Sequence, residues 1–238
     1  MNKKFVSAWK SAAAGAVLLG GMGAAHGAEV SANVTLATDY SFRGVSQTDR
    51  EGAIQGGFDV AFDNGLYIGT WSSNVEFGEV SQELDLYIGY SGEINENLSF
   101  DVNYVRFEYP GGGSDLDYNE FGGSLSFADF TVGLIYSNEY FALDDVTWFY
   151  PYVQYSLGLP NEASLDFHVG LSSVDDNSSD DWVSAFGDEE VIDYGVTYTM
   201  PFYGVDLGIG IVGTDADGSD GCDKLCELRP ILSLSKSL

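Results

Sequence analysis

Residues 83–104, ELDLYIGYSGEINENLSFDVNY, decide the fold class. Apolar and polar residues alternate from Leu84 to Tyr90 and again from Leu98 to Tyr104, and the polar run GEINEN separates the two stretches. Strict alternation over such a length predicts a β-strand with one apolar and one polar face. Two of these stretches around a short polar run predict an antiparallel hairpin with long strands.

The same alternation continues through most of the chain after residue 28. It predicts about twelve strands of roughly ten residues, which is the length that a tilted strand needs to cross a bilayer. Short connections such as DNG at 63–65 take turns with longer ones such as GEVSQ at 78–82 and PGGGSDLD at 110–117. Tight turns at one end and longer loops at the other are typical of outer-membrane proteins. We therefore expect an all-β fold, a transmembrane antiparallel up-and-down β-barrel.

A soluble β-sandwich is the alternative, because it also buries one face of each strand and solvates the other. Strand length, loop alternation and aromatic residues near the expected strand ends favour the barrel. In a barrel the apolar parity faces lipid and the polar parity faces the lumen. We expect the aromatic residues to form a lipid-facing girdle at the outer end, made of Tyr40, Phe42, Phe107, Tyr109, Tyr118, Tyr140, Phe141, Trp148 and Tyr150.

The N-terminal 27 residues predict a cleaved signal peptide. Lys3, Lys4 and Lys10 supply positive charge, residues 11–25 are uncharged and mostly small or apolar, and AHG at 25–27 puts small residues at the cleavage positions. We expect a signal peptide over residues 1–27 and an exported barrel over residues 28–238. The expected location is the outer membrane of a Gram-negative bacterium, in contact with membrane lipid and lipopolysaccharide.

The charge of the chain excludes nucleic acid as a partner. The sequence has 37 acidic and 9 basic residues and a formal net charge of −28. Every acidic residue follows the predicted signal peptide, whereas three of the basic residues lie within it, so the exported part is more acidic still. Such a surface repels a polyanion.

The polar parity of the predicted strands gathers the candidate pore-lining residues: Asp39, Arg43, Asp59, Glu83, Asp85, Asp101, Asp166, His168, Asp193, Asp206 and Arg229. Arg43 lies in ATDYSFRGVSQTD, residues 37–49, which we interpret as the outer part of the first strand with Arg43 pointing into the lumen. Acidic residues around a narrow aqueous passage favour cations over anions. A barrel of this size has a narrow interior, so a packed lumen without a conduction path stays open as an alternative.

Few residues suggest chemistry other than pore lining. Cys222 and Cys226 are predicted to form a disulfide in an oxidising compartment. The acidic runs DDNSSDD at 175–181 and DADGSDG at 215–221 offer oxygen ligands for calcium, but the run that starts at Asp215 lacks the glycine and glutamate spacing of an EF-hand loop. His168 is the one histidine after the signal peptide, and we expect it to line the lumen. We expect no catalytic residues, metal or cofactor.

The segments at 37–49, at 53–78 (AIQGGFDVAFDNGLYIGTWSSNVEFG) and at 83–93 (ELDLYIGYSGE) resemble the TorF-type porin family of proteobacteria. The resemblance extends to the closing segment LRPILSLSKSL at 228–238 and so covers nearly the whole exported part. It implies an outer-membrane barrel with a porin role.

These observations predict a porin that passively conducts small hydrophilic solutes, with a preference for cations. Two alternatives come from other classes of protein. The first is a structural or adhesion barrel that acts through its acidic extracellular loops, and the second is a barrel enzyme, which the sequence supports least. The sequence leaves open whether identical chains form a homo-oligomer.

Overall fold

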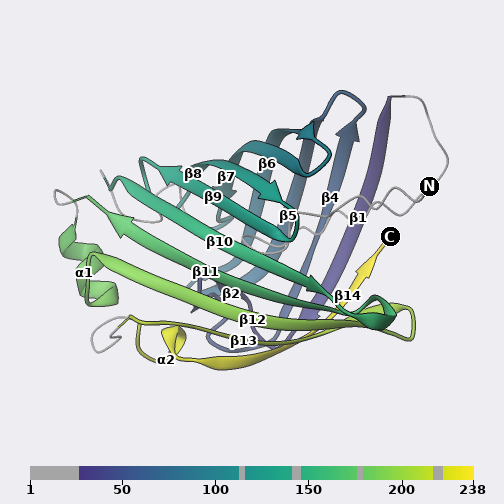
Figure 1. Cartoon of the computed structure of the whole chain (residues 1–238). Helices are drawn as coiled ribbons and strands as arrows, with labels where there is room; N and C mark the ends of the chain where they lie inside the picture. Colours follow the sequence, from purple (N-terminus) through teal and green to yellow (C-terminus); the bar gives the residue numbers. More distant parts are fainter. Residues whose placement is uncertain (1–26, 113–115, 141–145, 176–178, 217–221) are drawn as a thin grey trace.

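The computed structural model describes residues 27–112, 116–140, 146–175, 179–216 and 222–238. Twelve antiparallel strands close into a barrel in which each strand pairs with its neighbours in sequence and β1 also pairs with β14 (Figure 1). The barrel strands are β1 Ala28–Ala37, β4 Ala53–Phe62, β5 Leu66–Phe77, β6 Val80–Asn95, β7 Leu98–Glu108, β8 Tyr118–Phe127, β9 Phe130–Ser137, β10 Trp148–Gly158, β11 Ser164–Val174, β12 Glu190–Phe202, β13 Val205–Thr214 and β14 Arg229–Ser237. The predicted fold class and strand number are confirmed.

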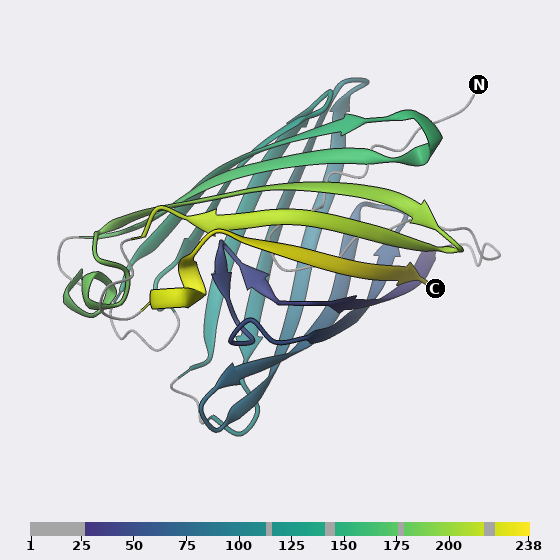
Figure 2. The same ribbon diagram turned by 90° about the horizontal axis from the view of Figure 1, so that it is seen from below.

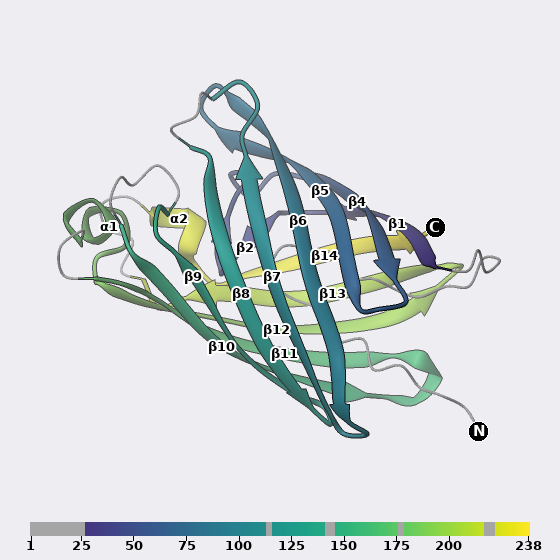
Figure 3. The same ribbon diagram turned by 90° about the horizontal axis from the view of Figure 1, so that it is seen from above.

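The two ends of the barrel differ. One end, the turn end, holds the tight connections at 63–65, 96–97, 128–129 and 203–204 and the 3-10 helix η1 (Pro160–Glu162). The other end, the loop end, holds the longer connections and two short helices, α1 (Ser179–Phe186) and α2 (Asp223–Cys226), which Figures 1 and 3 show on the same side of the barrel. Short connections therefore gather at one end of the barrel and longer connections at the other, as their alternation in the sequence predicted.

One predicted loop is a tight turn instead. β5 and β6 extend past their neighbours at the loop end and are joined by Gly78 and Glu79, so GEVSQ at 78–82 does not form a longer connection. Gly78 takes φ +67°, which a glycine adopts without steric cost, and this allows the strands to reverse directly. No helix among the described residues is long and apolar enough to cross a membrane.

Apolar side chains cover the outer face of the barrel. Phe58 on β4, Val102 on β7 and Leu134 on β9 are about half exposed or more (65%, 50% and 49%), and their sequence neighbours point inward. An apolar outer face around a polar interior is the arrangement that lipid requires of a spanning barrel. The predicted strand parity thus gives the correct inner and outer faces.

The segment after β1 does not continue the first strand, and this corrects the interpretation of residues 37–49. β1 ends at Ala37, and residues 38–52 fold into the barrel as a small separate hairpin, in which β2 (Ser41–Phe42) pairs only with β3 (Val45–Ser46). We call residues 38–52 the inner hairpin; its β2 is visible within the barrel in Figures 1 and 3. The chain reverses at Arg43 and Gly44, whose φ values of 47° and 79° are left-handed and incompatible with a strand.

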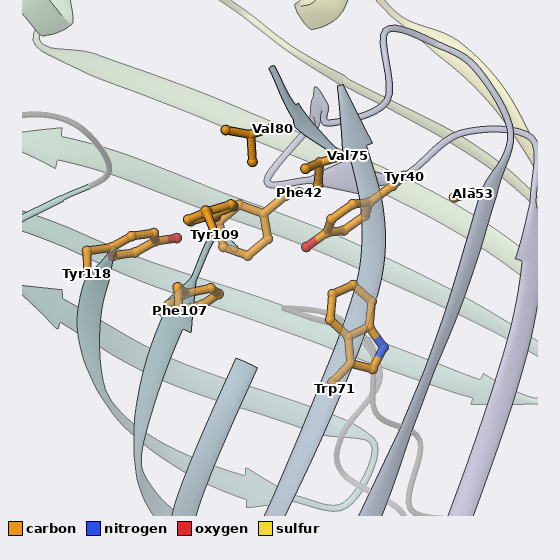
Figure 4. Close-up of a cluster of buried hydrophobic side chains, with 9 residues drawn as sticks. All are labelled: Tyr40, Phe42, Ala53, Trp71, Val75, Val80, Phe107, Tyr109 and Tyr118. Carbon is orange, nitrogen blue, oxygen red and sulfur yellow. The ribbon is translucent and has the colours of Figure 1, made fainter. Parts of the chain in front are cut away.

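The predicted aromatic girdle is also wrong, because its members among the described residues lie inside the barrel. Two groups of buried side chains fill the loop-end half of the lumen. The first cluster consists of Tyr40, Phe42, Ala53, Trp71, Val75, Val80, Phe107, Tyr109 and Tyr118 (Figure 4). The second cluster consists of Ile135, Val146, Trp148, Tyr150, Val174, Trp182 and Val191. Tyr140 packs against both clusters, and Phe141 lies outside the described residues.

The reason for this inward packing is the inner hairpin. It brings Tyr40 and Phe42 into the lumen, where the Tyr40 ring lies edge-on to Trp71 (centroids 5.2 Å apart) and Phe42 edge-on to Phe107 (5.9 Å). Burying large aromatic side chains removes apolar surface from water and therefore stabilises this packing. Figure 2, a view from below, shows the two ends of the barrel, and the buried side chains of both clusters fill the loop end.

Candidate functional site: the barrel lumen

Arg43 lies at the centre of the loop-end lumen. Its guanidinium donates two parallel hydrogen bonds to Glu120 on β8, from Nη1 to Oε1 (2.6 Å) and from Nη2 to Oε2 (2.7 Å). Its Cζ atom lies over the rings of Trp148 (4.2 Å to the centroid) and Tyr150 (4.7 Å) on β10, and over its own neighbour Phe42 (4.2 Å). The two carboxylate oxygens compensate the charge of the guanidinium and accept its hydrogen bonds, and the aromatic rings pack against its flat face.

The Arg43 charge is kept in spite of burial. Burial lowers the pKa of the guanidinium, the Glu120 carboxylate raises it, and the net pKa lies above the ordinary value for arginine. The side chains of Arg43 and Glu120 are each 4% exposed, so the ion pair is protected from solvent screening. The sequence predicted an inward Arg43 but not its partner Glu120, although Glu120 shares the parity of the inward Tyr118 on β8.

Two more acidic residues lie beside this ion pair on β6. Glu83 accepts hydrogen bonds from the phenol groups of Tyr40 and Tyr109, both at 2.7 Å. Burial, reinforced by the charge of Glu83, raises the pKa of the Tyr40 phenol well above its ordinary value, so Tyr40 stays a donor. Asp85 is 1% exposed, and neither of its carboxylate oxygens has a hydrogen-bond partner among the described residues. The loop-end lumen therefore contains more carboxylates than cations.

A second buried ion pair connects the inner hairpin to β14. Arg229, the first residue of β14, bonds Asp39 through Nε, and its Nη1 donates to the carbonyl oxygens of Gly44 (2.7 Å) and Leu225 (3.0 Å). Asp39 also accepts a hydrogen bond from the Ser46 hydroxyl (2.6 Å). One arginine thus ties together the hairpin, the barrel wall and the segment that carries α2.

In the turn-end half of the lumen, two carboxylates are hydrogen-bonded to tyrosine hydroxyls, as Glu83 is at the loop end. Asp59 accepts a hydrogen bond from Tyr87, and Asp101 accepts from Tyr67 (2.9 Å). The two tyrosine rings lie across glycines of the neighbouring strand. A Cβ atom at Gly89 would come within 2.2 Å of the Tyr67 ring, so glycine at this position is what allows that ring to lie flat on the wall.

The remaining candidate residues lie on β11, β12 and β13. His168 Nε2 is 2.7 Å from the Tyr150 hydroxyl and 3.0 Å from Asp193 Oδ1, so these three side chains form one network between the two halves of the lumen. Asp166 accepts hydrogen bonds from Ser156 and Ser164, both at 2.7 Å.

Asp206 is half-buried on β13, opposite Ser235 of β14. The predicted pore-lining residues that belong to barrel strands are on the inner face by strand alternation. Asp39 and Arg43 belong to the inner hairpin and lie within the lumen, in contact with Arg229 and Glu120.

Features predicted outside the lumen lie at the loop end. Cys222 and Cys226 bracket α2 as a bonded pair with Cα atoms 5.6 Å apart. The acidic runs fall partly on residues 176–178 and 217–221, which lie outside the described residues. Within the part of the chain that the structure describes, no group of three or more His, Cys, Asp or Glu side chains is placed to hold a metal ion.

Comparison with solved structures shows the fold class of this barrel. A structure of the NanC porin superposes with a TM-score of 0.56 at 12% sequence identity and covers 88% of this chain and 100% of its own. A structure of the KdgM porin superposes with a TM-score of 0.51 at 8% identity and covers 87% of this chain and 97% of its own. No curated protein sequence matches the chain. A family model described as bacterial protein of unknown function matches residues 21–237, and the chain therefore belongs to that family, Gcw_chp.

Proposed function

We propose that the chain is an outer-membrane porin that passes small hydrophilic solutes and prefers cations. The observation that carries this proposal is an acid-rich, polar inner wall enclosed by an apolar outer face in a closed barrel. Such a barrel offers water-soluble molecules a polar path while its outside satisfies lipid.

The cation preference rests on the turn-end half of the lumen. Asp59, Asp101, Asp166 and Asp206 make no ion pair with any Lys, Arg or His that the structure describes. Hydrogen bonds from neutral hydroxyl groups leave the negative charge of a carboxylate in place. Their combined potential in a narrow, low-dielectric passage attracts cations and repels anions.

Several further assignments belong to this proposal. The outer membrane of a Gram-negative bacterium is the expected location, with residues 1–27 removed as a signal peptide and with lipid and lipopolysaccharide as surroundings. The resemblance of residues 37–93 to TorF-type porins supports the same role.

A second candidate function is a closed barrel with a structural or adhesive role. It is favoured by the dense packing at the loop end, where Trp148 and Tyr150 are fully buried and the inner hairpin lies across the lumen. In that case the solute path is blocked in the state that the structure describes.

Conductance of the refolded protein in planar lipid bilayers separates the two candidates. A porin of the proposed kind gives stepwise currents and, in a salt gradient, a reversal potential on the cation side. The double variant Asp59→Asn/Asp101→Asn, which keeps side-chain size, should move the reversal potential toward zero. An absence of current would favour the closed barrel, and anion selectivity would contradict the argument from the acidic wall.

A further inference from the structure

Arg43 occupies a site that the barrel wall builds without it. Glu120 is on β8, and Trp148 and Tyr150 are on β10, so all three belong to the paired strands of the barrel. The Trp148 and Tyr150 rings are stacked on each other with centroids 5.4 Å apart and an interplanar angle of 9°. We call Glu120, Trp148 and Tyr150 the cage. Because its strands are held by the barrel ladder, the cage keeps its geometry when its occupant leaves.

The occupant, in contrast, comes from a segment outside the barrel ladder. β2 and β3 pair only with each other, so moving the inner hairpin breaks no strand pairing of the barrel. Arg43 is held at φ 47°, a backbone conformation that a residue with a side chain adopts at an energetic cost. Its Nε is buried without a hydrogen-bond partner, so the fit between Arg43 and the cage is incomplete.

The charge of the region also favours a cation at this position. If Arg43 leaves, Glu120 remains with Glu83 and Asp85, and Asp85 already lacks a hydrogen-bond partner among the described residues. Buried carboxylates without a counter-charge are costly, so an emptied cage would attract another cation. The flat faces of Trp148 and Tyr150 and the two oxygens of Glu120 suit a planar guanidinium better than a spherical ion.

We propose that the cage is a guanidinium-binding site that Arg43 fills in this state and that a guanidinium-bearing solute can fill in its place, displacing the Arg43 side chain while the Asp39–Arg229 ion pair still holds the hairpin. The substrate class is then small solutes with a guanidinium group, and the solute opens its own path through the loop end. Only the passage of the solute through the loop end rests on the proposed channel function. Binding to the cage is independent of conductance.

The test uses ethylguanidinium, which copies the end of the arginine side chain, and full-length protein refolded in detergent micelles. In the Arg43→Ala variant the cage is empty, so millimolar ethylguanidinium should change tryptophan emission and raise the thermal unfolding midpoint. The neutral analogue N-ethylurea should do neither. Adding Glu120→Gln should weaken ethylguanidinium binding by about tenfold, because the charge-assisted fork is lost.

A second variant covers the case in which Arg43→Ala fails to fold. Gly44 has φ +79°, and a Cβ atom there would come within 2.5 Å of Thr214 and 2.7 Å of the Gly213 carbonyl oxygen. Gly44→Ala therefore disfavours docking of the hairpin and leaves the cage side chains unchanged, so it should respond to ethylguanidinium as Arg43→Ala does. An equal response with and without Glu120→Gln, or no response in either variant, would overturn the proposal.

Conductance then separates this inference from the porin function. If ethylguanidinium binds the variants but the wild-type protein never conducts, the cage stands and the channel proposal fails. If wild-type protein conducts and ethylguanidinium leaves both the current and the emission of the variants unchanged, the channel proposal stands and the cage proposal fails.

Discussion

Removal of the Arg229 guanidinium should destabilise the protein far more than removal of another arginine from the same region. Arg229→Ala leaves the Asp39 carboxylate buried without its counter-charge and removes the donors to the Gly44 and Leu225 carbonyl oxygens. Both Arg229 and Asp39 are about 95% buried. Breaking a buried ion pair from one side costs about 3–5 kcal/mol, because the remaining charge is uncompensated.

Arg50 provides the matched control. It belongs to the inner hairpin and pairs with Glu227 at 2.8 Å, but the two side chains are 30% and 65% exposed. Solvent screens such a pair, and Arg50→Ala should cost about 0–1 kcal/mol. The comparison thus contrasts a buried ion pair that joins the hairpin to β14 with an exposed ion pair that joins it to the segment after α2.

The assay is urea unfolding of the refolded variants in micelles, followed by tryptophan emission. The double variant Asp39→Asn/Arg229→Ala removes the stranded charge and should recover about 1–3 kcal/mol relative to the sum of the single changes. If Arg229→Ala loses less than about 1 kcal/mol, or no more than Arg50→Ala, the claim that this buried contact anchors the hairpin is refuted.

Three further predictions follow from other parts of the barrel. Gly89→Ala should cost about 1–3 kcal/mol in urea unfolding because its Cβ would strike the tyrosine ring packed on the wall, whereas Gly158→Ala, with open space around it, should be near neutral. Leu134→Arg on the outer face should cost about 2–4 kcal/mol when the barrel is folded into lipid vesicles, and an unchanged folding equilibrium would contradict the assigned outer face. Alkylation with iodoacetamide and mass measurement should find Cys222 and Cys226 unmodified until a reductant is added.

Strand parity predicted which side chains point into the barrel and which point outward, because successive residues of a strand lie on opposite faces of the barrel wall. The inward positions of Asp59, Asp101 and Asp193 follow from that rule, since each lies on a regular strand between outward apolar residues. The number of strands was predictable for the same reason: each crossing of the bilayer needs a similar length of alternation.

Strand parity also places the aromatic residues in the lumen, whereas the expected lipid-facing girdle places them on the outer face. Phe107 shares the parity of the inward Asp101, and Tyr118 that of Glu120, so a consistent use of the rule places both rings in the lumen. The girdle was expected because aromatic residues near strand ends are typical of lipid interfaces. In this barrel the same rings are buried against the inner hairpin instead.

The inner hairpin itself could not be predicted from alternation. Tyr40 and Phe42 continue the apolar–polar alternation of β1. An alternation with a period of two residues therefore does not mark the point where the chain leaves the sheet. The signal was the pair Arg43–Gly44, a charged residue followed by a glycine, which permits the left-handed reversal. The partnership of Arg43 with Glu120 is a contact over 77 positions in sequence, and only the closed barrel brings the two together.

The line along which the barrel closes has a consequence for how it is assembled. β1 pairs with β14 over Asn33–Ala37 only, whereas its pairing with β4 runs over its whole length. A slip of two residues between the first and last strands would keep each side chain on its own face, so the apolar pattern does not forbid it. Such a slip would move Arg229 roughly 7 Å away from Asp39. The contact between Arg229 and Asp39 therefore selects one register of β1 against β14 when the first and last strands pair.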